Sequence, residues 1–270
     1  MRVPVRIGPY LNGIGIAMVC TYLVLPTLAV IPVSFTATDY ITFPPQGFSA
    51  RWYFAFVGED AWRNASITSL LVAIGSMVSA TVIGTLAAMG LRRLTALIAR
   101  VVIWLFLLPI IIPSIILAVA LYGAFAELGI VGTKLGLVVA HTIITFPFVV
   151  INVSVVLQKM DWRMVDAARS LGASPRVAFW KVTLPTILPG VLAGAVFAFL
   201  TSFDEVVVAL FISGVNSITL PVQMWNGIRF EVSPAVAAAS SILLVLSILF
   251  LLALSWLRQR VNRGQFVSAT

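Results

Sequence analysis

Charged side chains are scarce in this sequence. They make up 10% of its 270 residues, and the mean hydropathy is +1.10. A soluble globular domain carries about 25% charged residues, so this shortfall excludes an ordinary water-soluble domain. Several uncharged runs exceed the roughly 20 residues that a helix needs to cross a bilayer, whereas a membrane barrel would show short alternating strands. The composition therefore predicts an all-α polytopic membrane protein.

Cysteine and histidine each occur only once. A single cysteine, Cys20, excludes an intrachain disulfide. His141 has no accompanying cluster of cysteines or acids, and a metal site needs several ligands, so we expect it to serve in helix packing. The sequence also lacks the phosphate-binding pattern Gly-x-x-x-x-Gly-Lys-Ser/Thr and any evident nucleophile–base pair. We therefore expect that this chain binds no cofactor or metal and is not itself an enzyme.

Six long apolar segments follow one another along the chain. Segment 206–228 is also uncharged, but its second half is too polar to face lipid, and we do not count it as a crossing. Pro109 and Pro113 predict a kink in the third segment. Segment 39–63 reads as an extramembrane loop with a short interfacial helix near Trp52. The chain is expected to form one transmembrane domain, 1–270, with spans at about 12–34, 64–91, 101–125, 135–157, 184–212 and 235–257.

Six spans divide the 17 basic residues unevenly between the two sides of the membrane. One side carries four: Arg51, Arg63, Lys134 and Arg229. The other carries 13: Arg2, Arg6, Arg92, Arg93, Arg100, Lys159, Arg163, Arg169, Arg176, Lys181, Arg258, Arg260 and Arg263. The positive-inside rule assigns the richer side, with both termini and the polar segment 158–183, to the cytoplasm. The net charge of +8 thus reports topology, and no nucleic-acid partner is expected.

The polar segment 158–183 reads as two short helices. Asp161 can cap the first, and Gly172 stands where a helix ends on a left-handed residue. Ser174 and Pro175 can begin the second, because proline is well tolerated in a first turn. From the residues alone, this segment either lies on anionic headgroups through its basic side chains or fits a groove in another protein.

The spacing within this segment resembles the coupling motif of the membrane subunits of ABC importers, Glu-Ala-Ala, three residues, Gly, nine residues, Ile, one residue, Leu-Pro. Asp here replaces Glu and Val replaces Ile. The resemblance implies the fold of a type I ABC importer permease. In that fold a cytoplasmic coupling loop lies between spans four and five, at 158–183 here, and docks on an ATPase subunit. The residues to which it assigns ATPase coupling are Asp166, Ala167, Ala168, Gly172, Leu184 and Pro185.

Other stretches resemble the polyamine-type branch of these permeases: TFPPQGFSARWY at 42–53, SFDEV at 202–206, FISG at 211–214 and LPVQMW at 220–225. This resemblance implies a permease of the bacterial inner membrane for a small cation such as putrescine or spermidine. Its implied partners are a second homologous permease in a heterodimer, two ATPase subunits that hold ATP and Mg, and a periplasmic binding protein. The alternatives are an importer of opines, amino acids or related amines, a stand-alone secondary transporter, which usually shows internal repeats, and a lipid-binding scaffold.

Asp204 and Glu205 are the only acids inside a predicted span. A charge within a membrane is costly unless it lines water or has a partner. Both follow Pro185 by about 20 residues, roughly 30 Å of helix, which places them in the outer half of the membrane. We expect one or both to face the substrate pathway, the alternative being a buried cap or ion pair. Trp225 is a candidate to stack on an amine, although an interfacial anchor is the commoner role.

Overall fold

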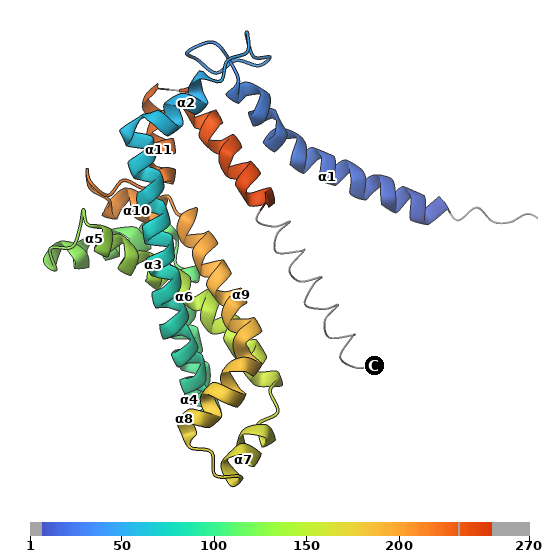
Figure 1. Cartoon of the computed structure of the whole chain (residues 1–270), viewed down its shortest axis with the longest axis vertical. Coiled ribbons are helices and arrows are strands. Elements are labelled where there is room, and N and C mark those ends of the chain that lie inside the picture. Colours follow the sequence, from blue (N-terminus) through green and yellow to red (C-terminus); the bar gives the residue numbers. More distant parts are fainter. Residues whose placement is uncertain (1–6, 232, 250–270) are drawn as a thin grey trace, which may run out of the picture. The chain divides into compact units, whose positions relative to one another are not determined.

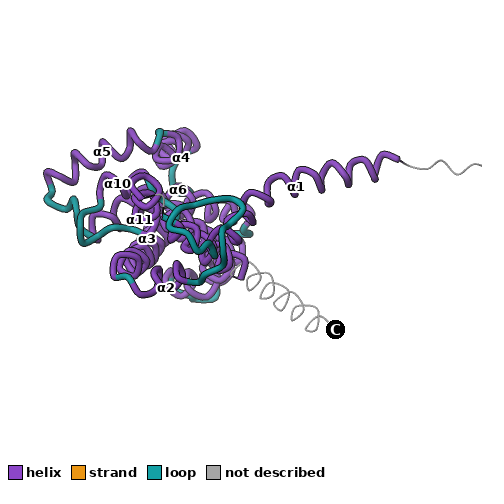
Figure 2. The backbone as a smooth tube through the Cα atoms, turned by 90° about the horizontal axis from the view of Figure 1, so that it is seen from above, coloured by secondary structure: helices purple, strands orange, loops and turns teal. Residues whose placement is uncertain are grey.

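The computed structural model of this chain describes residues 7–231 and 233–249. All regular secondary structure in those ranges is helical (Figure 2). The described residues form two compact units, one drawn from Met1–Arg63 with Asn226–Thr270 and the other from Asn64–Trp225. The expectations for both termini, for the end of the sixth span and for the basic residues Arg2, Arg6, Arg258, Arg260 and Arg263 lie outside the described residues.

The first unit contains α1 (Ile7–Ser34) and the short helix α2 (Arg51–Gly58). The part of α1 from Gly15 to Ser34 is long and apolar enough to span a membrane, and only 6% of its most apolar window is buried. The loop between α1 and α2 is held by an ion pair of 2.8 Å between Arg51 and Asp39. α2 lies within segment 39–63, so the short helix expected in that loop is confirmed.

The same unit ends in a π-turn, η2 (Gly227–Glu231), and an apolar helix over Pro234–Leu249. The helix reaches the limit of the described residues and covers the first part of the predicted sixth span.

The second unit is built on three long apolar helices (Figure 1). They are α3 (Asp60–Leu91), which starts in the first unit, α6 (Lys134–Lys159) and α9 (Leu184–Phe203). α9 continues without a break from α8 (Pro175–Ala178) through the π-turn η1 (Phe179–Thr183). Among the described residues, four helices are long and apolar enough to cross a membrane, and a bent pair adds a fifth if it counts as one span.

The bent pair replaces the single kinked helix predicted for span 101–125. α4 (Ala96–Ile111) and α5 (Ser114–Glu127) meet at 100°. The break falls at Ile112, whose extended backbone (φ −70°, ψ 130°) follows from the proline after it, because a residue before proline is disfavoured in the helical region. Pro109 stays inside α4. Of the two prolines, Pro113 alone therefore marks the break.

α6 is the most buried of the long helices, with 56% of its most apolar window inside the protein. Its first half packs with α5 and with α10 (Val207–Ile212), and its second half packs with α3 and α9. Val149 of α6 lies between two glycines: a Cβ added to Gly84 of α3 would come within 2.7 Å of Val149 Cβ, and one added to Gly194 of α9 within 2.8 Å of Val149 Cα. Small residues thus let the three backbones approach closely.

Replacing Gly194 by alanine should destabilise this packing, because the added methyl group meets the backbone of α6 and not a movable side-chain end. We expect a loss of about 1–3 kcal/mol, the usual cost of overpacking a core, measured as unfolding of the purified chain in detergent. Gly123→Ala is the matched control, since a Cβ at Gly123 of α5 has no atom within 4 Å. Equal stability of the two variants would contradict the close approach.

Candidate functional site

The polar segment between α6 and α9 forms a helix–turn–helix. Its first helix, α7, covers Arg163–Ser170, and Asp161 Oδ1 accepts a hydrogen bond of 3.0 Å from Arg163 N. α8 begins after Ser174, whose hydroxyl accepts from the backbone N–H of Val177, with Pro175 in its first turn. The cap expected at Ser174 is therefore present, whereas the N-cap position of α7 is taken by Trp162 and Asp161 lies one residue before it, where its carboxylate still accepts from the first N–H of the helix.

Gly172 ends α7 in the left-handed conformation, with φ +89°. The N–H of Ala173 donates to the carbonyl of Ala168 at 3.0 Å, and the N–H of Gly172 donates to that of Arg169 at 3.0 Å. These two bonds define a Schellman motif, in which glycine is preferred because it adopts a positive φ without strain. The turn predicted at Gly172 is confirmed.

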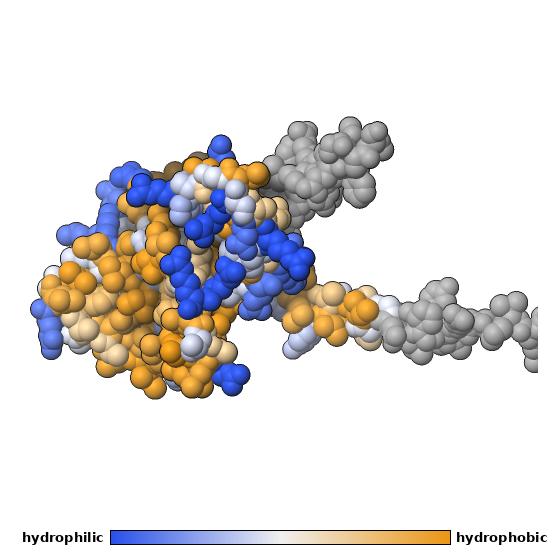
Figure 3. Space-filling model, turned by 90° about the horizontal axis from the view of Figure 1, so that it is seen from below, coloured by the Kyte–Doolittle hydropathy of each residue, from blue (hydrophilic) through white to orange (hydrophobic). Residues whose placement is uncertain are grey.

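Exposure divides the residues of this coupling segment. Asp166, Ala167 and Gly172 are exposed and Ala168 is half-buried. Leu171 is 90% exposed, whereas Val165 packs against the cluster of α3, α6 and α9. Figure 3 shows hydrophilic residues gathered at this end of the molecule, next to extensive apolar surface. The large apolar side chains that the segment leaves exposed are Met164, Leu171, Val177 and Trp180.

Leu184 and Pro185 lie in the first turn of α9. Leu184 packs against the cluster of α3, α6 and α9, while Pro185, the second residue after the π-turn η1, is exposed. Because α8, η1 and α9 are continuous, one helical rod, Pro175–Phe203, connects the coupling segment to the far end of α9.

Asp204 and Glu205 occupy the turn between α9 and α10. Glu205 Oε1 accepts a hydrogen bond of 2.9 Å from Val208 N, so this carboxylate caps α10. Asp204 is exposed, and within its unit its side chain has no hydrogen bond or ion pair among the described residues. Both line a depression of about 340 Å³ together with Leu200 and Thr201. The structure thus gives Glu205 the capping role and leaves Asp204 with a carboxylate directed at no protein partner.

Trp225 is not brought to this depression. It lies in α11 (Leu220–Asn226), is 44% exposed and does not belong to the residues that line the cavity of Asp204 and Glu205. The first turn of α11 is fixed by a hydrogen bond of 2.7 Å from Leu220 N to Ser69 Oγ of α3. The two acids and the tryptophan that the sequence grouped together therefore do not share one pocket.

A cluster of three buried polar side chains that the sequence did not reveal is centred on Ser202, two residues before Asp204. His141 Nδ1 lies 2.9 Å from Ser202 Oγ and 3.1 Å from the Ser202 carbonyl, and Ser76 Oγ lies 2.8 Å from Ser202 Oγ. Each residue belongs to a different helix: α3, α6 or α9. The three side chains fix the end of α9 that carries the acidic turn. The only signal in the sequence was an isolated histidine, and histidine alone does not name its partners.

Replacing Ser202 by alanine should remove the hydroxyl that Ser76 and His141 share, while the Ser202 carbonyl stays near His141 Nδ1 and the Ala73 carbonyl stays near Ser76 Oγ. We expect a loss of about 1 kcal/mol in the free energy of unfolding, since each of the two interhelical hydrogen bonds contributes roughly 0.6 kcal/mol. Thermal unfolding in detergent measures the change. Ser154→Ala is the control, because the buried Ser154 hydroxyl of α6 has no hydrogen-bond partner, and its removal should cost nothing. An equal loss in both variants would contradict the role of the cluster.

The fold of this chain is shared with a solved structure. A chain of a bacterial ABC transporter involved in the import of the acidic polysaccharide alginate matches it with a TM-score of 0.74 at 12% identity, over 94% of this chain and 98% of that one. Residues 80–263 match the family model of the binding-protein-dependent transport system inner membrane component. The chain belongs to this family.

Two curated relatives align over most of their length. The chain is 34% identical to the spermidine/putrescine transport system permease protein PotC of Escherichia coli K12, over 96% of this chain and 97% of PotC. It is 30% identical to the putrescine transport system permease protein PotI of the same organism, over 83% of this chain and 82% of PotI. The chain is thus an inner-membrane transport component, and the expected likeness to polyamine-type permeases is confirmed.

Proposed function

We propose that this chain is the permease subunit of an ATP-driven importer and forms half of the translocation pathway for a small cation of the polyamine class. The observation that carries the proposal is the exposed helix–turn–helix within Asp166–Pro185, which presents the spacing of the coupling motif at one end of a continuous helix. The apolar side chains exposed on this polar segment form a surface that an ATPase subunit could cover.

Coupling runs through the rod Pro175–Phe203. The turn at Gly172 fixes α7 against α8, and α8 continues through η1 into α9. Movement of an ATPase subunit against Ala167 and Ala168 is therefore passed to α9 as a rigid-body displacement and not absorbed by a flexible joint. The other end of the rod holds Asp204, so the same displacement alters the surroundings of the acidic turn. This continuity of the rod supports the proposed alternating access.

A cationic substrate fits the unpaired carboxylate of Asp204. An exposed carboxylate on a depression attracts an ammonium group, while the neighbouring Glu205 is engaged by α10. The names of PotC and PotI support a polyamine such as putrescine or spermidine. Opines, amino acids and related amines also carry ammonium groups, and one of these is the second candidate substrate class.

The assembly we propose contains this chain, a second homologous permease, two ATPase subunits and a periplasmic binding protein. The ATPase subunits hold ATP and Mg, and this chain supplies no catalytic group. Delivery of the substrate falls to the loops 39–63 and 213–234, on the side of the membrane opposite to the coupling segment. The apolar outer surface of α1 is available to lipid or to the second permease.

Reconstitution of the complete assembly in liposomes tests the function. ATP hydrolysis and uptake are measured with putrescine, spermidine, an opine and amino acids, each delivered by the binding protein. Stimulation of both activities by polyamines alone supports the proposal. Stimulation by another amine changes the substrate class, and ion-gradient-driven uptake by this chain without an ATPase subunit would overturn the importer assignment.

The double variant Ala168→Asp/Gly172→Leu should uncouple transport from ATP hydrolysis. A carboxylate enters the half-buried side of α7, and leucine at φ +89° is strained, so the turn that presents the segment is lost. We expect uptake to fall at least tenfold while the ATPase subunits retain basal hydrolysis. Leu94→Asp, in the turn between α3 and α4, is the control for an added charge at an exposed apolar position. Unimpaired uptake in the double variant would refute the coupling role.

Asp204→Asn should reduce uptake of a polyamine by about fivefold or more, because a charge pair near water contributes roughly 1 kcal/mol. Glu205→Gln is the matched control, since a glutamine oxygen still accepts the hydrogen bond from Val208 N. Initial uptake rates at saturating binding protein separate the two variants. If Glu205→Gln causes the larger loss, the charge that the substrate meets is that of Glu205 and not that of Asp204.

A further inference from the structure

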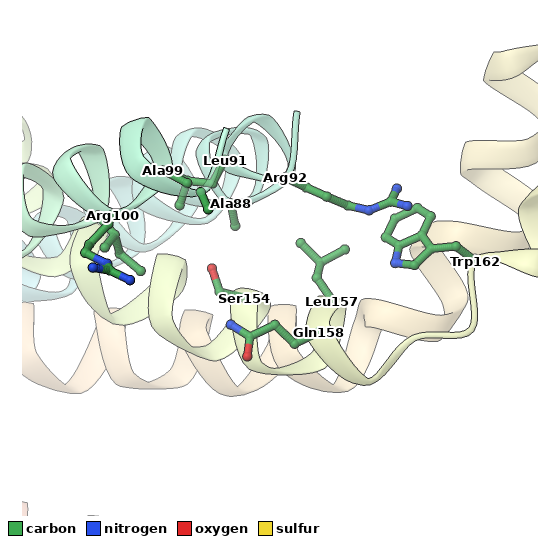
Figure 4. A pocket seen from close by; sticks show the side chains of 11 residues that line it. Ala88, Leu91, Arg92, Ala99, Arg100, Ser154, Leu157, Gln158 and Trp162 are labelled. Atoms are coloured by element: carbon green, nitrogen blue, oxygen red, sulfur yellow. The ribbon is translucent and has the colours of Figure 1, made fainter. Parts of the chain in front are cut away.

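A second cavity lies at the end of the second unit that carries the coupling segment. Its volume is about 500 Å³, and it is bounded by the end of α3, the start of α4 and the end of α6 (Figure 4). Arg92, Arg100 and Gln158 line it and are exposed, so the cavity opens to the surroundings. It is separate from the depression of Asp204 and shares no lining residue with it.

The polar part of the lining is positively charged. Arg92 and Arg100 enter from two sides, and no acidic residue lines the cavity. Neither arginine forms an ion pair among the described residues, where the pairs are Arg51 with Asp39 and Arg63 with Asp60. The Ser154 hydroxyl also lines this space, is buried and has no hydrogen-bond partner. Two unpaired guanidinium groups and an unused hydroxyl form a donor set for an anion.

Arg92 is held in place by an aromatic side chain. Its guanidinium carbon lies 3.2 Å from the centre of the Trp162 ring, and Figure 4 shows this stack at one wall of the cavity. Stacking on an aromatic face leaves the edge of a guanidinium available for hydrogen bonds. Trp162 directly precedes α7, so the wall of the cavity and the start of the coupling segment share one residue.

The rest of the lining is apolar, and this selects the kind of anion. Free phosphate is hydrated on every side and gains nothing from aliphatic walls, whereas a phospholipid places its phosphate beside the start of its acyl chains. The apolar lining residues are Ala88, Leu91, Ala96, Ala99, Ile103 and Leu157.

We propose that this cavity binds the headgroup of an anionic phospholipid, with Arg92 and Arg100, at two ends of the lining, as the basic residues that attract it and Ser154 as an additional donor. Anionic lipids are concentrated in the cytoplasmic leaflet, and basic pockets between membrane helices on that side bind their headgroups. Under the proposed orientation, the cavity opens at that leaflet. A bound lipid joins α3, α4 and α6 beside the base of α7.

Titration of the full chain in mild detergent with phosphatidylglycerol, followed by native mass spectrometry, tests the site. Arg92→Gln/Arg100→Gln should weaken binding about thirtyfold, since each basic residue near the surface contributes about fivefold. Arg93→Gln is the matched control, because Arg93 is exposed in the same turn but does not line the cavity. Ala99→Trp, which fills the cavity without changing its charge, should also abolish tight binding.

Phosphatidylcholine should bind weakly and equally to the chain and to each variant, which also reports that the variants are folded. An equal loss in Arg93→Gln would overturn the proposal in favour of diffuse charge attraction, and unchanged binding in the double variant would overturn it outright. Displacement of the lipid by inorganic phosphate at equal concentration would identify a free phosphate as the occupant and refute the lipid. Because neither ATP nor partner subunits are present, this outcome is independent of the proposed transport function.

Discussion

Close packing of α6 between α3 and α9 is the constraint on which the rest of the second unit depends. In a bilayer, apolar surface gains nothing by leaving lipid for another helix, so association relies on van der Waals contact and on interhelical hydrogen bonds. Gly84 and Gly194 allow the backbones to approach Val149, and Ser76, His141 and Ser202 supply the hydrogen bonds. The coupling segment and the acidic turn lie at the ends of these helices, so the packing fixes the positions of the two sites relative to each other.

α9 takes part in both the polar cluster, through Ser202, and the close backbone approach, through Gly194, so it links the helices of the unit. Gly194 holds its middle against α6, and Ser202 holds its last turn against α3 and α6. The other end runs without interruption into η1 and α8, next to the turn at Gly172. A rod that is fixed by packing along its length transmits a displacement better than a hinged pair of helices would.

Local features of the chain were predictable where a single residue type decides the backbone. Gly172 predicted a left-handed helix end because glycine adopts a positive φ without strain, and Ser174 predicted a cap because its oxygen accepts from a backbone N–H group. Asp161 predicted the start of α7 to within one residue, since Trp162 and not Asp161 is its N-cap. Pro113 predicted a disturbance but not its size, since a proline permits either a kink or a break and tertiary packing chooses between them. The partners of His141 were not predictable because they lie on other helices.

The different roles of Asp204 and Glu205 were likewise not predictable from the sequence. Adjacent acids are equivalent in a sequence, and only the position of α10 gives one of them a backbone N–H to bind. Trp225 does not line the depression of these two acids, because the first turn of α11 is anchored to Ser69 and not to the acidic turn. By contrast, the cavity of Arg92 and Arg100 joins residues that charge counting had noted only as markers of topology.

Two interruptions of helical backbone bear on where a polar substrate can be accommodated. Non-helical backbone within a membrane is tolerated only where protein covers it or where it lines water. The helices that follow the two breaks, α5 and α10, pack against each other, since their buried residues share one apolar cluster. Asp204 remains outside that cluster, exposed on a depression. An exposed carboxylate beside interrupted backbone requires water, and a water-lined surface is what a cation needs to leave the aqueous phase without losing all of its hydration.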